Sequence, residues 1–166
     1  MSKKPLILGI ESSCDETAAS LITENEQGNP VVLSNIISSQ VDVHKKFGGV
    51  VPELAARSHM EKIDWIVQKA IDDSGRKIEE IDAVASTAGP GLIVCLSVGL
   101  SFGKAFASAL EKPFIAVNHL EGHALSPKLN SSLNYPYLLL LISGGHSQFL
   151  NVQGLGNYKR LGTTID

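Results

Sequence analysis

The 166-residue sequence predicts an α/β protein in which the order strand, polar loop, strand occurs twice. Apolar runs of strand length alternate with segments whose apolar residues recur at helical spacing, as in layered α/β folds. The first copy of this pattern spans residues 6–23, and a second copy spans residues 137–153, although few residues are identical between the two. We therefore expect a complete first domain over residues 1–125, followed by a linker and the start of a second, truncated domain over residues 126–166.

The first domain is predicted to begin with two strands, residues 6–10 and 18–23, joined by the polar loop 11–17. Hydroxyl groups and main-chain amides in such a loop can bind phosphate, which makes Ser12 and Ser13 candidates for a phosphate loop. An ordinary polar hairpin explains the same residues equally well. The local pattern leaves both interpretations open.

The rest of the first domain continues with strand and helix patterns. Residues 31–38 predict a third strand, and apolar residues at helical spacing predict a helix over residues 51–71. Between them, residues 44–49 contain two lysines and two glycines and are expected to form a flexible, solvated loop. A fourth strand is predicted at residues 81–87, and a helix that is apolar nearly all round at residues 92–110. Such a helix is typically enclosed in a core.

Two glycines four residues apart, Gly99 and Gly103, predict that a neighbouring element crosses this second helix closely. Residues 114–117 predict the next strand, which places His119 at its carboxyl end, the edge at which open α/β sheets bind ligands. Residues 126–134 are expected to form a linker. The remaining strand patterns lie at residues 137–142, 148–153 and 158–165.

Composition limits the classes of function. Hydrophobic residues make up 43% of the chain and charged residues 19%, with a net charge of −3, so the sequence lacks the excess of Lys and Arg typical of a nucleic-acid binder. Cys14 and Cys95 are isolated and fit a reducing compartment. The uncharged stretch 83–103 is interrupted by Gly-Pro-Gly and by hydroxyl residues, which favours a strand, a turn and a helix over a membrane span. We expect a cytoplasmic protein with no membrane partner.

The strongest chemical signal is the pair His119 and His123. On a helix, a spacing of four residues places both imidazoles on one face, where they can bind one transition metal. Such pairs also arise by chance on solvated or core-lining faces. A zinc protease would have the order His-Glu-x-x-His, whereas Glu121 lies two residues from each histidine and is directed away from a shared metal.

Five stretches of the chain, taken in this order, resemble the TsaD (Gcp) family. They are GIESSCDET at residues 9–17, GGVVPELA at 48–55, TAGPG at 87–91, HLEGH at 119–123 and SGGHSQ at 143–148. The resemblance implies the duplicated α/β fold of the actin, Hsp70 and sugar-kinase (ASKHA) superfamily. It also implies a tRNA-modifying acyltransferase. Members transfer the threonylcarbamoyl group from threonylcarbamoyl-AMP to N6 of the adenosine at position 37 of tRNAs that read ANN codons.

The same resemblance implies roles for particular residues. Asp15 and Glu16 fall on acidic catalytic positions, and His119 and His123 fall on ligands of one divalent metal, Fe or Zn. The substrate-binding positions implied by the resemblance are Leu141, Ile142, Ser143, Gly144 and Gly145. Members are much longer than this chain and act with the proteins TsaB and TsaE. We therefore expect the fragment alone to be inactive and to hold metal weakly. Because its second sheet lacks covering helices, we also expect it to self-associate or to rearrange its tail.

Three other functions remain open at this point. A noncatalytic scaffold of the same superfamily is expected to lack the paired histidines. A small-molecule kinase would need an aspartate base near the phosphates, for which Asp15 is the candidate, and would have no use for a metal-binding His pair. A metallo-glycoendopeptidase would need a general base that Glu121 does not supply.

Overall fold

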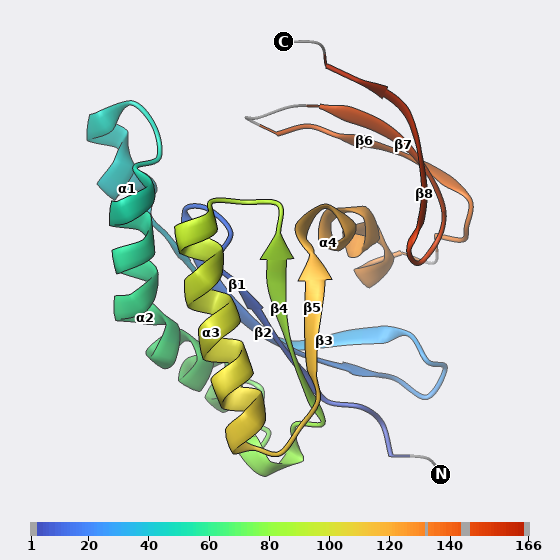
Figure 1. Cartoon of the computed structure of the whole chain (residues 1–166). Helices are drawn as coiled ribbons and strands as arrows, with labels where there is room; N and C mark the ends of the chain where they lie inside the picture. The colour runs from blue at the N-terminus through green and yellow to red at the C-terminus, as the bar shows by residue number, and fades with distance from the viewer. Residues whose placement is uncertain (1–2, 132, 144–146, 165–166) are drawn as a thin grey trace. The chain divides into compact units, whose positions relative to one another are not determined.

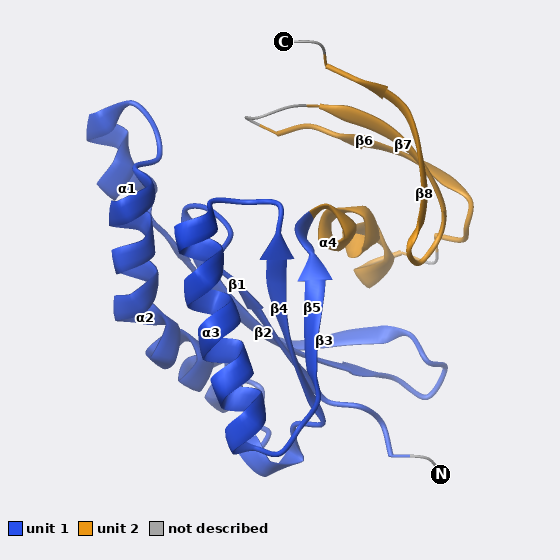
Figure 2. Ribbon diagram, in the orientation of Figure 1, with its two compact units in different colours: residues 1–119 blue, residues 120–166 orange. Residues whose placement is uncertain are grey.

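The computed structural model describes residues 3–131, 133–143 and 147–164. The chain divides into two compact units, residues 1–119 and residues 120–166 (Figure 2). The boundary falls inside helix α4 (His119–Leu125). The first unit therefore ends with the first residue of this helix.

The first unit is built on a mixed five-stranded sheet with the order β3-β2-β1-β4-β5 (Figure 1). The strands are β1 (Ile7–Glu11), β2 (Glu16–Glu24), β3 (Pro30–Ser39), β4 (Ala83–Gly89) and β5 (Phe114–Asn118). The first three form an antiparallel meander, whereas β4 runs parallel to β1 and β5 runs parallel to β4. The carboxyl ends of β1, β4 and β5 consequently meet at one edge of the sheet, where α/β proteins place their ligand sites.

Two helices, α2 (Pro52–Asp73) and α3 (Ile93–Ala109), lie side by side on one face of this sheet (Figure 1). Helix α2 begins with a proline in its first turn, where the missing N–H costs no hydrogen bond. Its buried residues, among them Ile63 and Ile66, join a core that includes Leu8, Ile10 and Leu21 of the sheet. The predicted strands and helices of this unit are therefore confirmed, with ends that shift by a few residues.

Helix α3 approaches the sheet closely at its two glycines, as the sequence predicts. A Cβ atom at Gly99 would lie 2.3 Å from Oγ of Ser12, and one at Gly103 would lie 2.2 Å from Oγ of Ser86. Both distances are far inside van der Waals contact. The glycines are thus required because strand β4 and the loop after β1 pack directly against the helix backbone.

The segment between β3 and α2 includes residues 44–49, for which a flexible, solvated loop is predicted. It contains the short helix α1 (Val41–His44) and a 3-10 turn (Lys45–Phe47), and His44 is buried. The Nε2 atom of His44 lies 3.2 Å from Oε1 of Gln40, and its Nδ1 atom accepts the N–H of Val51 at 3.3 Å. These hydrogen bonds hold the buried ring of His44, whereas residues 45–49 are exposed, as expected for a solvated connection.

The second unit contains the rest of α4, a 3-10 turn (Ser126–Leu129) and an antiparallel sheet of three strands with the order β6-β7-β8. The strands are β6 (Tyr137–Leu141), β7 (Gln148–Gly154) and β8 (Asn157–Thr163), as the patterns predict. Among the described residues, Ala124, Leu150 and Val152 form a small buried cluster in this unit. The hydroxyl of Tyr137 donates to the carbonyl of Ala124 at 2.5 Å and attaches β6 to α4.

The uncharged stretch 83–103 is divided between β4 and the first part of α3, as predicted. In the described part of the chain, none of the helices has the combination of length and apolar character that crossing a membrane requires.

Candidate functional site

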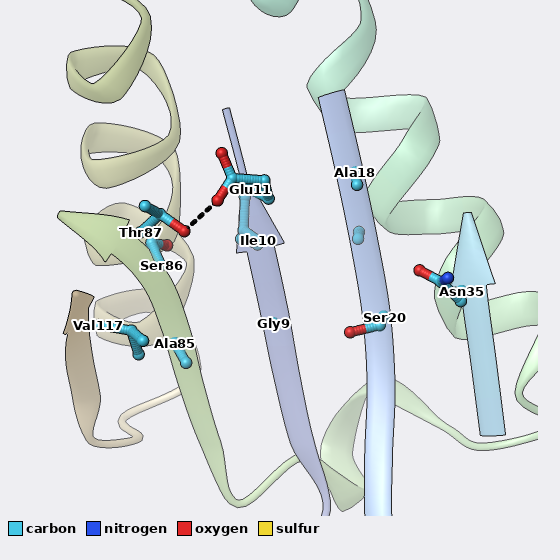
Figure 3. Close-up of a pocket in the computed structure, with 11 residues that line it drawn as sticks. Gly9, Ile10, Glu11, Ala18, Ser20, Asn35, Ala85, Ser86, Thr87 and Val117 are labelled. Atoms are coloured by element: carbon cyan, nitrogen blue, oxygen red, sulfur yellow. Dashed lines mark hydrogen bonds between the residues drawn. The ribbon is translucent and has the colours of Figure 1, made fainter. Parts of the chain in front are cut away.

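The carboxyl edge of the first sheet brings together Glu11, Thr87 and His119. Glu11 is the last residue of β1, Thr87 lies near the end of β4, and His119 follows directly after β5. The hydroxyl of Thr87 donates to Oε2 of Glu11 (Figure 3), and the same oxygen lies 3.4 Å from Nδ1 of His119. The main-chain N–H of Ser13 donates to the other carboxylate oxygen, Oε1.

The carboxylate of Glu11 is ionised in this setting. Burial by itself raises its pKa, but hydrogen bonds from His119, Ser13 and Thr87 outweigh burial and lower the pKa to about 2. The hydrogen bond to Glu11 in turn raises the pKa of His119, against the opposing effect of burial. Glu11 and His119 thus form a charge-assisted pair that is partly shielded from solvent.

The two serines of the candidate phosphate loop are buried and make internal hydrogen bonds. The hydroxyl of Ser12 donates to the carbonyl of Cys95 at 2.9 Å and accepts the N–H of Gly99 at 3.1 Å, which attaches the loop to α3. The hydroxyl oxygen of Ser13 lies 3.3 Å from Nδ1 of His119, and its carbonyl accepts the N–H of Leu92 at 2.8 Å. A phosphate at this loop would have to compete with these bonds for the two hydroxyls.

The acidic residues of the same loop are more accessible. Asp15 is partly buried, and its carbonyl accepts the N–H of Gln40 at 3.0 Å. Glu16 is exposed and begins β2, opposite Ser39 of β3. Both carboxylates therefore lie on the loop and strand that follow Glu11, within the first unit.

The histidine pair occupies one short helix, with His119 at the start of α4 and His123 one turn later. His119 is partly buried and His123 is exposed. Glu121 lies between them in sequence, and its Oε1 accepts hydrogen bonds from the N–H of Gly156 at 2.9 Å and the hydroxyl of Tyr158 at 2.6 Å. Glu121 thus stabilises the turn between β7 and β8, a role that differs from that of a protease base.

The predicted substrate-binding loop follows β6. Leu141 is buried as the last residue of that strand, whereas Ile142 and Ser143 are exposed. Gly144 and Gly145 lie outside the described residues. The structure therefore shows the start of this loop and not its glycine pair.

A shallow pocket of about 240 Å³ lies on the face of the sheet opposite to α2 and α3, and it reaches the Glu11 and Thr87 pair (Figure 3). Small residues, including Gly9, Ser20 and Ala85, form its floor. A Cβ atom at Gly9 would lie 3.2 Å from Oγ of Ser20, so even an alanine there would crowd the floor. The pocket and the carboxyl edge belong to one continuous surface of the first unit.

Glu11 and Thr87 are the functional candidates that the sequence reasoning missed. Both lie inside stretches that carry the family resemblance, but neither was assigned a role. One signal in the sequence could have drawn attention to Glu11: it is the charged residue directly after the apolar run 6–10, which predicts a strand. Carboxyl ends of parallel strands share an edge, so such residues are expected to meet.

The donors at this edge fit a divalent metal as part of a ligand set. Two imidazoles one helical turn apart are ligands that both Fe and Zn accept. His119 has, in Glu11, the carboxylate partner that metal-binding histidines generally have on their other ring nitrogen. No group of three or more His, Cys, Asp or Glu side chains suited to a metal ion occurs within residues 3–131, 133–143 and 147–164.

Sequence comparison identifies relatives along the whole chain. The profile of the TsaD family, described as tRNA N6-adenosine threonylcarbamoyltransferase, matches residues 31–166. A protein of that name from Pelagibacter ubique is 84% identical over 166 residues, which cover 100% of this chain and 46% of that protein. One from Brucella canis is 58% identical over 160 residues, which cover 96% of this chain and 45% of that protein. The chain spans about half the length of these curated relatives.

Solved structures match the fold at low sequence identity. YeaZ from Pseudomonas aeruginosa has a TM-score of 0.60 and 17% identity, over 96% of this chain and 66% of that one. A Ppx/GppA family member from Aquifex aeolicus has a TM-score of 0.53 and 11% identity, over 98% of this chain and 51% of that one. These matches confirm the predicted ASKHA-like α/β fold. The family profile, which covers most of the chain, and the sequences of the relatives show that this chain belongs to the TsaD family.

Proposed function

We propose that a protein of the relatives' length containing this chain transfers a threonylcarbamoyl group from threonylcarbamoyl-AMP to N6 of adenosine 37 in tRNAs that read ANN codons. The observation that carries the proposal is the 84% identity, over all 166 residues, to a protein named tRNA N6-adenosine threonylcarbamoyltransferase. The chain spans 46% of that relative, so we assign the activity to the longer protein and expect this chain alone to be inactive.

In this reaction the protein has to orient the two substrates, and no covalent intermediate with the protein is needed. The adenosine N6 attacks the carbamoyl carbon, a C–N bond forms, and the C–O bond to the phosphate of AMP breaks with its electron pair leaving on AMP. The amine loses one proton in the process. Holding the two substrates in line supplies a large part of such a rate enhancement.

We assign His119 and His123 as ligands of one divalent metal, Fe or Zn, which would polarise and orient the carbonyl of the threonylcarbamoyl group. The support is their spacing on α4 and the carboxylate of Glu11 beside His119. Two protein ligands hold a metal weakly, because stable sites have three or four. The described residues supply no third ligand to this pair, so further ligands would come from substrate, water or residues outside the described part of the protein.

The remaining site residues are proposed from the family pattern and their accessibility. We assign Asp15 and Glu16 to the catalytic loop, where both are at least partly exposed. We assign Leu141, Ile142, Ser143, Gly144 and Gly145 to substrate binding. Ser12 and Ser13 are proposed to keep the loop in place through their bonds to α3 and His119.

We also propose tRNA, TsaB and TsaE as partners. The chain has a net charge of −3, which gives no excess of positive charge for binding a phosphate backbone. The basic surface that tRNA requires would therefore come from the rest of the longer protein or from these partner proteins.

Transfer of labelled threonylcarbamoyl to tRNA by the longer protein tests the proposal. We expect His119→Ala and His123→Ala each to lower the rate by more than about 100-fold, since loss of a ligand should exceed the roughly 10- to 100-fold effect of losing a residue that only orients a ligand. Glu61→Gln, a change at an exposed position of α2, is the control and should retain the rate. No transfer by the wild-type protein, with its partners and both substrates present, would instead support a noncatalytic scaffold.

A further inference from the structure

We propose that Glu11 is a positioning residue for His119. Its carboxylate accepts the Nδ1–H of the imidazole and so selects the ring tautomer that has its lone pair on Nε2, the nitrogen that would bind a metal. The inference deepens the function proposed above and rests on it for the role of the metal. It is carried by the geometry of Glu11, Ser13, Thr87 and His119 at the carboxyl edge of the sheet.

The backbone fixes where these groups meet. Strand β1 pairs in parallel with β4, with Ile10 opposite Ser86, and β4 pairs in parallel with β5, with Ser86 opposite Ala116. Glu11 therefore follows directly after Ile10, the last residue of β1 that pairs with β4, and His119 follows directly after the last residue of β5. A site on adjacent strands of one sheet is held more precisely than a site on loops.

The carboxylate is held on both of its oxygens. The N–H of Ser13 donates to Oε1, and the hydroxyl of Thr87 donates to Oε2. These bonds stabilise the ionised form, which can only accept hydrogen bonds. An imidazole nitrogen that faces such an oxygen is stable there only when it carries a hydrogen, so the 3.4 Å approach of Glu11 to Nδ1 places the proton on Nδ1.

Ser13 alone could not make this selection. Its hydroxyl oxygen lies 3.3 Å from Nδ1 of His119, but a hydroxyl can donate to a bare nitrogen as readily as it accepts from a protonated one. Of Ser13 and Glu11, it is the carboxylate of Glu11 that discriminates between the tautomers. Neutral histidine with hydrogen on Nδ1 has its lone pair on Nε2, and Nε2 is then the nitrogen with which the ring would bind a metal.

The test is the ¹⁵N spectrum of the histidine rings in the metal-free 166-residue chain, at a pH high enough to keep His119 neutral. Free neutral imidazole in histidine favours hydrogen on Nε2, so a preference for Nδ1–H must come from the protein. We expect wild-type His119 to be in the Nδ1–H form, and Glu11→Ala to shift it to the Nε2–H form. Glu11→Gln keeps the side-chain volume and serves if the alanine variant fails to fold, with the Nδ1–H population expected to fall.

Two matched variants separate positioning from general disturbance of the site. Thr87→Val removes one donor to Glu11 but leaves the carboxylate, so His119 should remain in the Nδ1–H form. Glu61→Gln makes the same chemical change at an exposed position of α2 and should leave the spectrum of His119 unchanged. A wild-type ring in the Nε2–H form, or a Glu11→Ala ring that stays in the Nδ1–H form, would overturn the proposal.

Titration of the same variants with Zn²⁺, followed at the ring nitrogens of His119, is the second readout. Loss of a carboxylate that orients a metal-binding histidine typically weakens affinity roughly 10- to 100-fold, and we expect that range for Glu11→Ala. Equal affinity of the wild type and Glu11→Ala would contradict a positioning role. Neither measurement uses acyl transfer, so failure of the proposed activity and failure of this inference give different results.

Discussion

His59 is a neutral histidine enclosed between helix α2 and the loop that follows β1. It is 0% exposed, and its Nε2 lies 3.0 Å from the carbonyl oxygen of Cys14, which can only accept. Its Nδ1 lies 2.7 Å from the hydroxyl of Thr17, which therefore donates. Burial lowers the pKa of His59 below its ordinary 6.5, although the hydrogen bond to Cys14 opposes that effect. Protonating this ring is therefore harder in the folded chain than in the unfolded chain.

This environment predicts a loss of stability in mild acid. As the pH falls through 6.5 towards the lower pKa of the folded state, the unfolded chain binds more protons at His59 than the folded chain does, so the free energy of unfolding falls as the pH decreases. The contribution is at most about 1.4 kcal/mol per pH unit. We expect His59→Gln to be less stable than the wild type at neutral pH but to have a flatter pH dependence, measured by denaturant unfolding between neutral pH and about pH 5.

The matched control is Met60→Gln, which changes an exposed residue of α2 that does not titrate. It should leave the slope of stability against pH close to that of the wild type. Equal slopes for the wild type and His59→Gln would show that His59 is not the residue responsible.

Strand β4 packs directly against the backbone of helix α3 at Gly103. This close packing limits which side chains position 103 can hold. A Cβ atom there would lie 2.2 Å from Oγ of Ser86 and 3.1 Å from Cε2 of Phe114. Replacing glycine by alanine in a helix normally gains up to about 1 kcal/mol. We expect the clash to outweigh this gain, so that Gly103→Ala destabilises the chain by about 1–3 kcal/mol in denaturant unfolding.

A double-mutant cycle with Ser86→Ala identifies the cause. Within the described residues, Oγ of Ser86 has no hydrogen-bond partner, so its removal loses no bond and relieves the closest contact. We expect the double variant to recover part of the stability that Gly103→Ala loses, whereas strict additivity would contradict the clash. Gly122→Ala, in α4 with nothing within 4 Å of its new Cβ, is the helical control and should be neutral or stabilising.

The two compact units of the whole molecule differ in the amount of buried core. In the described residues, the first unit has a large cluster that joins β1, β2 and β4 to α2, whereas the cluster of the second unit contains Ala124, Leu150 and Val152. The free energy of local unfolding rises with the amount of buried apolar contact, so regions of one chain can differ widely in their protection from amide hydrogen exchange. We expect slower amide hydrogen exchange in β1 and β4 than in β6 and β7, measured residue by residue by NMR. Equal protection in both sheets would indicate a single cooperative unit.

The sequence by itself determined the order of strands and helices, the fold class and the position of the histidine pair. Each of these depends on local information: apolar periodicity marks the strands and helices, and two histidines four residues apart need only a helix to share a face. The close approach to Gly99 and Gly103 was also predictable, because glycines spaced one turn apart in an apolar helix leave room for a neighbouring backbone.

Only the tertiary structure decided which side chains meet. Glu11 and His119 are 108 residues apart in sequence, and their contact depends on the parallel pairing of β1, β4 and β5, which no local pattern encodes. The burial of His44 and His59 has the same origin, since their hydrogen bonds reach other segments of the chain. Local periodicity specifies the faces of each element, whereas the partner of a polar side chain is fixed only when sheet register places two distant strand ends side by side.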